Sequence, residues 1–310
     1  MPQHSPILFH YDQSPFAEKA RLMIGFKRLD WQSVVVPNIP PRPELDQLTG
    51  GYRRIPVMQI GADIYCDTQL IAAELERRYP EPSFFHGGHE GIARMIGAWA
   101  DKAFFADAIA VAIAEAIPHL PPAFIEDRKA MTEGGFDPER MQRNLSFHEN
   151  QVRAHLDLLE AELGDERAFL LGDSPGLADI HAYMNVFIVA NAPVGERLLS
   201  ALPRLRRWMQ RVAAIGHGSR REISVADAIH TASHAAPAIT DGTADAGDPA
   251  GHKPGDRVTV TPADVARVPV TGTLLHASVQ RIALLRETED AGAVAVHFPR
   301  LGFTVEAARG

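Results

Sequence analysis

The sequence predicts an α/β domain at the N-terminus, then an all-α helical domain, and a small β-rich module at the C-terminus. Strand-like and helix-like patterns alternate through about the first eighty residues. An alanine-rich stretch with helical periodicity follows, and the end of the chain returns to short runs rich in β-branched residues. The predicted parts are residues 1–82, 90–220 and 221–310.

The N-terminal region opens with a strand, a helix and a second strand. Ile7–Tyr11 is a short apolar run, and Asp12-Gln13-Ser14-Pro15 ends it. Ser14 is a favourable N-cap, and Pro15 suits the first position of a helix. Trp31–Val36 is rich in β-branched residues and predicts the second strand. This order implies two parallel strands joined by a right-handed crossover.

A short hairpin and a helix complete the N-terminal domain. Val57–Ile60 and Ile64–Cys66 read as strands, with a tight turn at Gly61-Ala62-Asp63. Asp67-Thr68 then opens a helix that ends near Pro80. The order is therefore strand–helix–strand, a proline-rich loop, and strand–strand–helix.

The second predicted part has a helical sequence pattern, whereas the third consists mainly of short predicted strands. Val152, Leu156, Leu159 and Leu163 form one apolar stripe, as expected in a helical domain. Glu222 to Ala235 predicts one more helix, and 236–255 reads as a linker. The predicted strands of the C-terminal module are Arg257–Thr261, Val270–Leu275, Ile282–Arg286, Ala293–Phe298 and Phe303–Ala307.

Composition narrows the class of protein. The chain has 310 residues, a net charge of −8 and no long basic run, which argues against a nucleic-acid partner. Its single cysteine, Cys66, excludes a disulfide within one chain and fits a reducing cytoplasm. We see no signal peptide at the N-terminus and no apolar stretch of membrane-spanning length, so we expect a cytoplasmic protein.

Two features of the N-terminal domain suggest a site for a small peptide. Pro56 at the mouth of a strand fits an edge, a bend or a cis peptide, and such a bend exposes backbone groups that an extended peptide can pair with. The helix that begins at Asp67-Thr68 offers free N–H groups and a positive dipole end, which suit a carboxylate. The alternative is a plain hairpin that leads into a helix with an ordinary N-cap.

Ser14 has a chemical reading beside its structural one. Its hydroxyl would lie at the positive end of a helix, where the dipole and a hydroxyl hydrogen bond help a thiol to ionise. On this reading the serine stabilises a thiolate that belongs to a bound peptide and is not itself the nucleophile. The alternative is a simple N-cap, and the two roles can coexist.

Four stretches in this order resemble the glutathione transferases, over about residues 5 to 215. The resemblance implies a thioredoxin-like N-terminal domain followed by the helical domain, with glutathione as co-substrate. The first stretch is similar to the serine-type, Tau-like and Omega-like sequences. The stretches are Ser14-Pro15-Phe16-Ala17-Glu18-Lys19-Ala20-Arg21, Arg54-Ile55-Pro56-Val57, Asp67-Thr68-Gln69-Leu70-Ile71 and Ser174-Pro175-Gly176-Leu177-Ala178-Asp179-Ile180.

The resemblance also implies roles for matching residues. Ser14 falls where these classes place the residue that activates the glutathione sulfur. Ile55 would pair its backbone with the cysteinyl part of glutathione, ahead of a cis-proline at Pro56. Asp67 and Thr68 match the acidic-hydroxyl pair that binds the γ-glutamyl end. The resemblance thus implies five glutathione-binding residues: Arg54, Ile55, Pro56, Asp67 and Thr68. Of these, Arg54 would face the glycyl carboxylate.

Departures from the family pattern limit what carries over. Because serine stands where Omega-like proteins have cysteine, we expect no thiol–disulfide exchange through a protein cysteine, and Cys66 reads as a small buried hydrophobe. Gly176 stands where the helical domain usually has a capping Ser or Thr, so we expect a slightly weaker helix start. The region beyond about residue 222 has no counterpart in ordinary two-domain members.

Two other signals carry less weight. Gly172-Asp173-Ser174-Pro175-Gly176 matches the G-x-S-x-G motif of hydrolases, but Pro175 lacks the N–H that the oxyanion hole needs. His230 and His234 are spaced i, i+4 without a third ligand, so we predict no metal site.

The sequence thus predicts a cytoplasmic glutathione transferase of the detoxification type, acting as a homodimer. Glutathione would attack a hydrophobic electrophile held by Tyr11, Phe16 and Trp99, although Trp99 fits a plain helix core equally well. One alternative is a non-catalytic binding or structural protein whose C-terminal module contacts a partner or builds an oligomer. Another is a glutathione-dependent isomerase or dehalogenase on the same fold.

Overall fold

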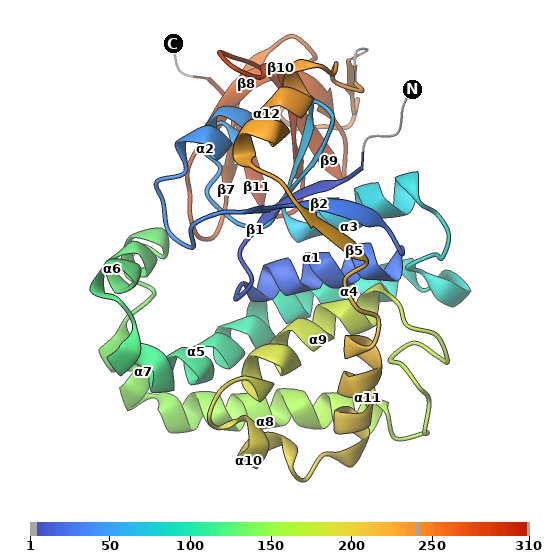
Figure 1. The fold of residues 1–310 in the computed structure, drawn as a ribbon, viewed down its shortest axis with the longest axis vertical. Coiled ribbons are helices and arrows are strands. Elements are labelled where there is room, and N and C mark those ends of the chain that lie inside the picture. Colours follow the sequence, from blue (N-terminus) through green and yellow to red (C-terminus); the bar gives the residue numbers. More distant parts are fainter. Residues whose placement is uncertain (1–4, 240–241, 309–310) are drawn as a thin grey trace. The chain divides into compact units, whose positions relative to one another are not determined.

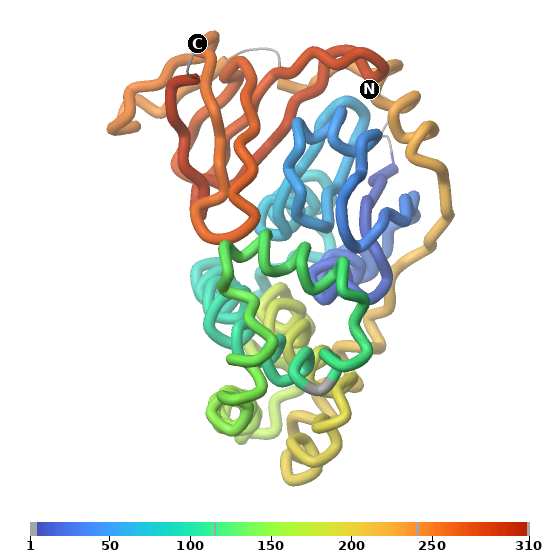
Figure 2. The backbone as a smooth tube through the Cα atoms, turned by 90° about the vertical axis from the view of Figure 1, so that its left-hand side faces the viewer, coloured from blue at the N-terminus to red at the C-terminus, as the bar shows by residue number. Residues whose placement is uncertain are grey.

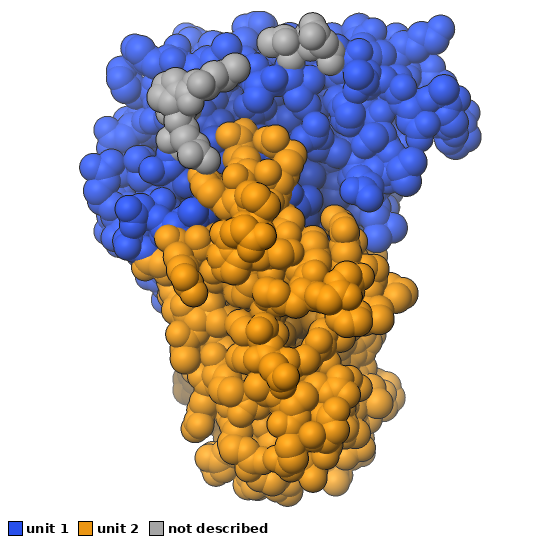
Figure 3. Space-filling view, turned by 90° about the vertical axis from the view of Figure 1, so that its right-hand side faces the viewer, with its two compact units in different colours: residues 1–17, 29–74, 219–310 blue, residues 18–28, 75–218 orange. Residues whose placement is uncertain are grey.

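A mixed β-sheet contains strands from both the N-terminal and the C-terminal regions of the chain. The structure is a computed structural model that describes residues 5–239 and 242–308. The chain divides into two compact units, shown in blue and orange in Figure 3. Residues 1–4, where we looked for a targeting segment, lie outside the described residues. Unit 1 consists of residues 1–17, 29–74 and 219–310, and unit 2 of residues 18–28 and 75–218.

The sheet of unit 1 contains every strand that the sequence predicts, and it also has short strands that the sequence does not predict. Its order is β11-β7-β8-β9-β10-β4-β3-β1-β2-β5, with β6 beside β8. β1 and β2 are parallel, as the strand–helix–strand pattern requires. The strands are β1 (Ile7–His10), β2 (Asp30–Val35), β3 (Val57–Ile60), β4 (Asp63–Cys66), β5 (Ser219–Glu222), β6 (Thr243–Ala244), β7 (Arg257–Pro262), β8 (Val270–Ala277), β9 (Arg281–Thr288), β10 (Gly292–Pro299) and β11 (Phe303–Ala307).

The C-terminal strands continue the N-terminal sheet through β10. β10 runs parallel to β4, with Val296 opposite Ile64, and Figure 2 shows the red C-terminal strands beside the blue N-terminal hairpin. Nε2 of His297 lies 2.7 Å from Oδ1 of Asp63, and both residues are buried. The His297 ring also stacks on Tyr65 at 4.6 Å. β4 is therefore an interior strand of this sheet, with β3 on one side and β10 on the other.

One hydrophobic core serves both halves of this sheet. It joins Phe9, Tyr52 and Ile64 to Val296 and Phe298. The Tyr52 ring lies 5.8 Å from Phe298, edge to face. We expected residues 221–310 to form a part of their own. Instead residues 219–310 share a unit and a core with the N-terminal strands, because β10 pairs with β4 and so extends the N-terminal sheet.

Among the described residues of unit 1, four helices belong to it wholly or in part: α1 (Pro15–Phe26), α2 (Pro43–Thr49), α3 (Thr68–Arg78) and α12 (Val225–Ser233). α2 and α12 pack against each other and against β10, as Figure 1 shows. α1 and α3 each begin in unit 1 and end in unit 2. Ser224 caps α12 with an Oγ that accepts a hydrogen bond from the Asp227 N–H at 3.1 Å.

Unit 2 is helical, as predicted, and α9 lies at its centre. α9 packs against α4, α5 and α11, and α5 packs against α8 (Figure 1). The sequence predicts helical segments up to about residue 117 and at about 138–163, 178–189 and 202–214, and the structure adds α6 and α10 outside them. The helical segments of unit 2 are η1 (His86–Gly88), α4 (Glu90–Trp99), the π-helical turn η2 (Ala100–Phe104), α5 (Phe105–Ala116), η3 (Ile117–His119), α6 (Pro122–Met131), α7 (Pro138–Arg143), α8 (Leu145–Glu162), α9 (Leu177–Ala190), α10 (Gly195–Leu199) and α11 (Pro203–Ala213).

Asp179 organises the start of α9. Its two carboxylate oxygens accept hydrogen bonds from the N–H groups of Leu170 and Gly176, each at 2.9 Å. The Trp208 indole N–H donates to the same carboxylate at 2.7 Å. Gly176 has no side chain to cap the helix, and Asp179 instead caps it from within the first turn.

His181, also on α9, is expected to make unit 2 sensitive to acid. Burial, then the charges of Lys19 and Arg94, lower its pKa well below the ordinary 6.5. The folded chain therefore keeps His181 neutral while the unfolded chain protonates it, so stability is lost as pH falls below about 6.5, by up to about 1.4 kcal/mol per pH unit. Thermal unfolding between about pH 7.5 and pH 5 should show a larger loss for the natural chain than for His181→Gln.

The exposed His234 supplies the control for this experiment. His234→Gln removes an exposed imidazole from unit 1 and should keep the acid sensitivity of unit 2. Equal acid sensitivity of His181→Gln and the natural chain would contradict the assignment.

No helix among the described residues is long and apolar enough to cross a membrane.

Candidate functional site

The candidate site residues gather at one end of three neighbouring strands of unit 1. Phe9 in β1 lies opposite Val57 in β3, and Val57 lies opposite Cys66 in β4. The residues just beyond this line are the turn after β1, the proline before β3 and the residue after β4. The register therefore brings the Ser14 turn, Pro56 and Asp67 to the same end of the sheet, where α1 and α3 begin.

Ser14 caps α1 and keeps its proton available. It is 2% exposed, and its Oγ accepts a hydrogen bond from the Ala17 N–H at 3.2 Å. Its own N–H donates to the Tyr11 carbonyl at 3.1 Å. A hydroxyl has one donor and two acceptor positions, and the Ala17 contact uses one acceptor position. The Ser14 O–H is thus left as a donor for an anion at the start of α1.

The Ile55–Pro56 peptide bond is cis, one of the three geometries that the sequence allowed. The β3 ladder begins at Val57, so Ile55 lies outside its register and is half-buried. This arrangement leaves the Ile55 backbone beside the sheet end, where an extended peptide can run past it.

Asp67 holds an unusual backbone conformation at the start of α3. Its φ is 76°, in the left-handed region that a non-glycine residue seldom adopts and that often marks a functional site. Its Oδ1 accepts a hydrogen bond from the Gln69 N–H at 2.9 Å. Thr68, the first residue of α3, is buried. The second carboxylate oxygen of Asp67 is suited to a ligand ammonium group at the same helix start.

Cys66 precedes Asp67 and is chemically quiet. The side chain is fully buried, and the thiol is free. Burial, followed by the negative charge of Asp67, raises its pKa well above the ordinary range. The thiol stays protonated and does not act as a nucleophile.

Arg54 has partners that the sequence did not indicate. Its guanidinium Nη2 donates to Asp264 and to the Val265 carbonyl, both in the loop between β7 and β8. The Tyr52 hydroxyl nearby is buried and has no hydrogen-bond partner in the described residues. Burial, and then the charge of Asp67, raise the pKa of Tyr52 well above its ordinary value, so its hydroxyl is a neutral donor.

The residues predicted to hold an electrophile fall in different units. Tyr11 and Phe16 are half-buried beside Ser14 in unit 1. Trp99 ends α4 in unit 2, where its indole N–H donates to Nδ1 of His155 at 3.3 Å. Nε2 of His155 lies 3.5 Å from Asp107. Their role toward an electrophile stays a prediction.

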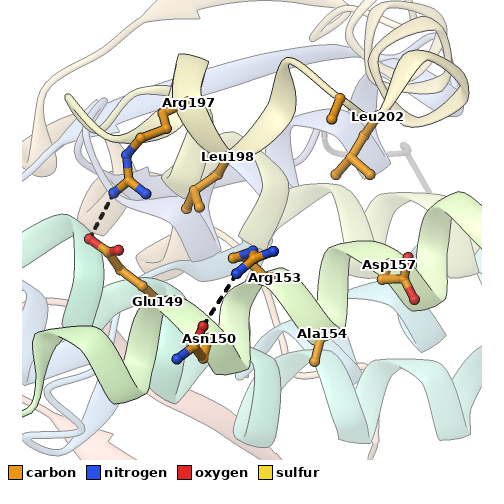
Figure 4. A pocket seen from close by; sticks show the side chains of 9 residues that line it. Glu149, Asn150, Arg153, Ala154, Asp157, Arg197, Leu198 and Leu202 are labelled. Carbon is orange, nitrogen blue, oxygen red and sulfur yellow. Dashed lines mark hydrogen bonds and ion pairs between the residues drawn. The ribbon is translucent and has the colours of Figure 1, made fainter.

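A pocket of about 560 Å³ lies in unit 2, between α8 and the segment around α10 (Figure 4). Arg197 binds Glu149 at 2.9 Å, and Arg153 donates to Asn150 at 3.4 Å. None of the predicted site residues lines it. Its lining residues are Glu149, Asn150, Arg153, Ala154, Asp157, Arg197, Leu198, Ala201 and Leu202. The predicted site residues of unit 1 lie instead at the sheet end described above.

Comparison with known protein families gives two matches. Residues 8–83 match the N-terminal domain of glutathione S-transferases, and residues 128–211 match their C-terminal domain. A GST-like protein from Pseudomonas syringae is 38% identical, with a TM-score of 0.81, and the match covers 98% of this chain and 99% of that one. The chain belongs to the glutathione S-transferase family. That match spans nearly all of both chains, so it includes the C-terminal strands.

Other transferase-fold structures match a smaller share of this chain. A glutathione S-transferase from Rhodospirillum rubrum is 22% identical, with a TM-score of 0.54, and covers 67% of this chain and 88% of its own. The β-etherase LigF from a Sphingobium species is 17% identical, with a TM-score of 0.51, and covers 68% and 95%. These two show the fold alone. No curated protein matches the chain.

The described residues contain no group of three or more His, Cys, Asp or Glu side chains placed to hold a metal ion. The rings of His230 and His234 lie 4.0 Å apart between centroids and are tilted by 45° to each other. Family members use glutathione as a substrate, and the polar groups at the sheet end of unit 1 suit a small zwitterionic peptide.

Proposed function

We propose that this glutathione transferase family member binds glutathione at the sheet end of unit 1 and activates its thiol with Ser14. The observation that carries the proposal is the Ser14 hydroxyl, which accepts from the Ala17 N–H and keeps its own O–H as a donor at the start of α1. A thiolate at this point receives that hydrogen bond and the positive end of the α1 dipole. Both effects favour the ionised sulfur over the thiol.

The other candidate residues would hold the rest of the peptide. The backbone of Ile55, beside cis-Pro56, would pair with the cysteinyl residue of glutathione. Asp67 and Thr68 would hold the ammonium and carboxylate of the γ-glutamyl residue. This division matches the chemistry, because a carboxylate binds the ammonium group and helix N–H groups bind the carboxylate.

In the proposed reaction the glutathione thiol gives its proton to solvent, and Ser14 stabilises the thiolate. The sulfur then forms a C–S bond to a hydrophobic electrophile beside Tyr11 and Phe16, whose leaving group takes the electron pair. Ser14 forms no covalent bond in this scheme. Trp99 as a further electrophile contact, a cytoplasmic setting and a homodimer belong to the same proposal.

Ser14→Ala tests the proposed role of the hydroxyl. We expect kcat/KM to fall by about 10²-fold or more, because the variant loses the group that stabilises the thiolate. Glutathione affinity measured by calorimetry should stay within about threefold, since the peptide contacts lie elsewhere. The ultraviolet absorbance of the bound thiolate should show a raised thiol pKa in the variant.

Cys66→Ala is the matched control, because Cys66 is buried close to the site but has no role in the scheme. It should keep the thiol pKa of the natural chain. Loss of turnover in Ser14→Ala without any change in thiol pKa would argue against this mechanism. Glutathione binding without turnover in the natural chain would favour the non-catalytic binding protein.

A further inference from the structure

The loop between β7 and β8 reaches the arginine that would face the glycyl end of glutathione. Residues 263–269 connect these strands, and the Ala263 N–H donates to the Gly302 carbonyl at 2.9 Å. Ala266 is 3% exposed and has a φ of 50°. The Val268 N–H donates to the Ala266 carbonyl at 2.7 Å. The loop is therefore held in one conformation by its own contacts.

Arg54 is already engaged by this loop. The two N–H groups of its Nη2 are accounted for by Asp264 and the Val265 carbonyl. Its Nε is buried and has no partner in the described residues. A bidentate grip on a ligand carboxylate needs two neighbouring guanidinium nitrogens. Arg54 therefore has at most Nη1 to offer a ligand, which is a single-point contact.

The charge of Arg54 is also balanced within the chain. Burial raises the pKa of Asp264, but the charge and hydrogen bond of Arg54 outweigh that effect and lower it below its ordinary value. Asp264 is therefore ionised at neutral pH. A second carboxylate that approaches Arg54 meets the negative charge of Asp264 at close range.

We infer that Asp264 is a specificity-determining residue, an internal carboxylate that takes the position of the glycyl carboxylate at Arg54. The site then accepts glutathione whose glycyl carboxyl is masked as an amide or ester at least as well as the free acid. This inference rests on the proposed function, because it concerns the glycyl end of the same bound peptide. It assigns to the C-terminal strands a direct part in ligand choice.

Calorimetry on the full chain with two probes tests this inference. The probes are glutathione and its glycyl monoethyl ester, which differ only at the glycyl carboxyl: the ester carries an ethyl group there and no charge. In the natural chain the ester should bind at least as tightly as the free acid. Asp264→Asn keeps the side-chain shape and removes the charge, so affinity for the free acid should rise about three- to tenfold while that for the ester changes little. The order of the two probes should thus invert.

Glu222→Gln is the matched control. Glu222 pairs with Arg220 at 2.9 Å on β5, at the opposite end of the sheet order from β7. Glu222→Gln also removes one negative charge, and it should leave the order of the two probe affinities as in the natural chain. Weaker binding of the free acid in Asp264→Asn would show that Asp264 only supports Arg54 and would overturn the inference. So would a clear preference of the natural chain for the free acid.

Failure of the proposed function gives a different result. If neither probe binds any of the three proteins up to about 10 mM, glutathione is not the ligand, and the inference falls with the proposal. If both probes bind, and Asp67→Asn weakens both while Asp264→Asn alters neither, the proposed function stands and the inference alone is lost.

Discussion

Removal of residues 219–310 is expected to unfold unit 1. More than half of the buried residues in its shared core come from this region, including Val296 and Phe298. The deletion would also leave β4 as an open edge and Asp63 without His297. Loss of one buried Phe costs about 3–5 kcal/mol, and a whole domain has a free energy of unfolding of only about 5–15 kcal/mol. Loss of all the core side chains in residues 219–310 should therefore exceed the free energy of unfolding of unit 1.

The measurement must report on unit 1, because residues 75–218 of unit 2 remain in the shortened chain. Hydrogen exchange of peptides that cover β3 and β4 meets this need. These peptides should be protected in the full chain and should exchange rapidly in residues 1–218. Adding residues 219–310 as a separate chain should restore protection. Slow exchange of β3 and β4 in the shortened chain alone would contradict the shared core.

A pair of point variants tests the same core without a deletion. Phe298 is fully buried, and Leu301, three residues later, is 68% exposed. Phe298→Ala should lower the free energy of unfolding by about 3–5 kcal/mol, whereas Leu301→Ala should change it by less than about 0.5 kcal/mol.

Local patterns were sufficient for the N-terminal elements. Ser14 and Pro15 marked the start of α1, and Pro56 marked the bend before β3, because capping and proline geometry depend on near neighbours. The C-terminal strands were also predicted from local patterns, namely short runs rich in β-branched residues. Ala293–Phe298 carried a further signal that we did not use: a run that is apolar on both faces fits a central strand, and β10 is buried on both.

Contacts between residues far apart in the sequence determine the elements and site contacts that local sequence patterns did not predict. β5, with the sequence Ser219-Arg220-Arg221-Glu222, is fully exposed and shows no alternation, and it is a strand because it pairs with β2. Gly25 lies inside α1, where glycine is unfavourable, yet a Cβ there would lie 2.0 Å from the Gly216 carbonyl oxygen. Asp264 lies 210 residues from Arg54, and no motif links them. The candidate site was thus predictable where it consists of helix starts and the cis-proline, and unpredictable where a distant loop joins it.

Asp179→Ala is expected to destabilise unit 2 more than other single substitutions on its surface or at its caps. The variant leaves three donors without their acceptor: the buried N–H of Leu170, the buried indole N–H of Trp208 and the partly buried N–H of Gly176. Each buried donor left unsatisfied costs about 1–3 kcal/mol, so we expect a loss of about 3–5 kcal/mol in the free energy of unfolding. Urea denaturation followed by circular dichroism measures it.

A graded series separates this network from a general effect of losing a carboxylate. Trp208→Phe keeps the ring and removes only one of the three donors, so the loss should be smaller, about 1–2 kcal/mol. Asp157→Ala removes an exposed carboxylate from α8 and should change stability by less than about 0.5 kcal/mol. If Asp179→Ala were no more destabilising than Asp157→Ala, the carboxylate would not hold the start of α9. The order Asp179→Ala, Trp208→Phe, Asp157→Ala is what a helix capped from within its own first turn requires, because Gly176 has no side chain to take over the cap.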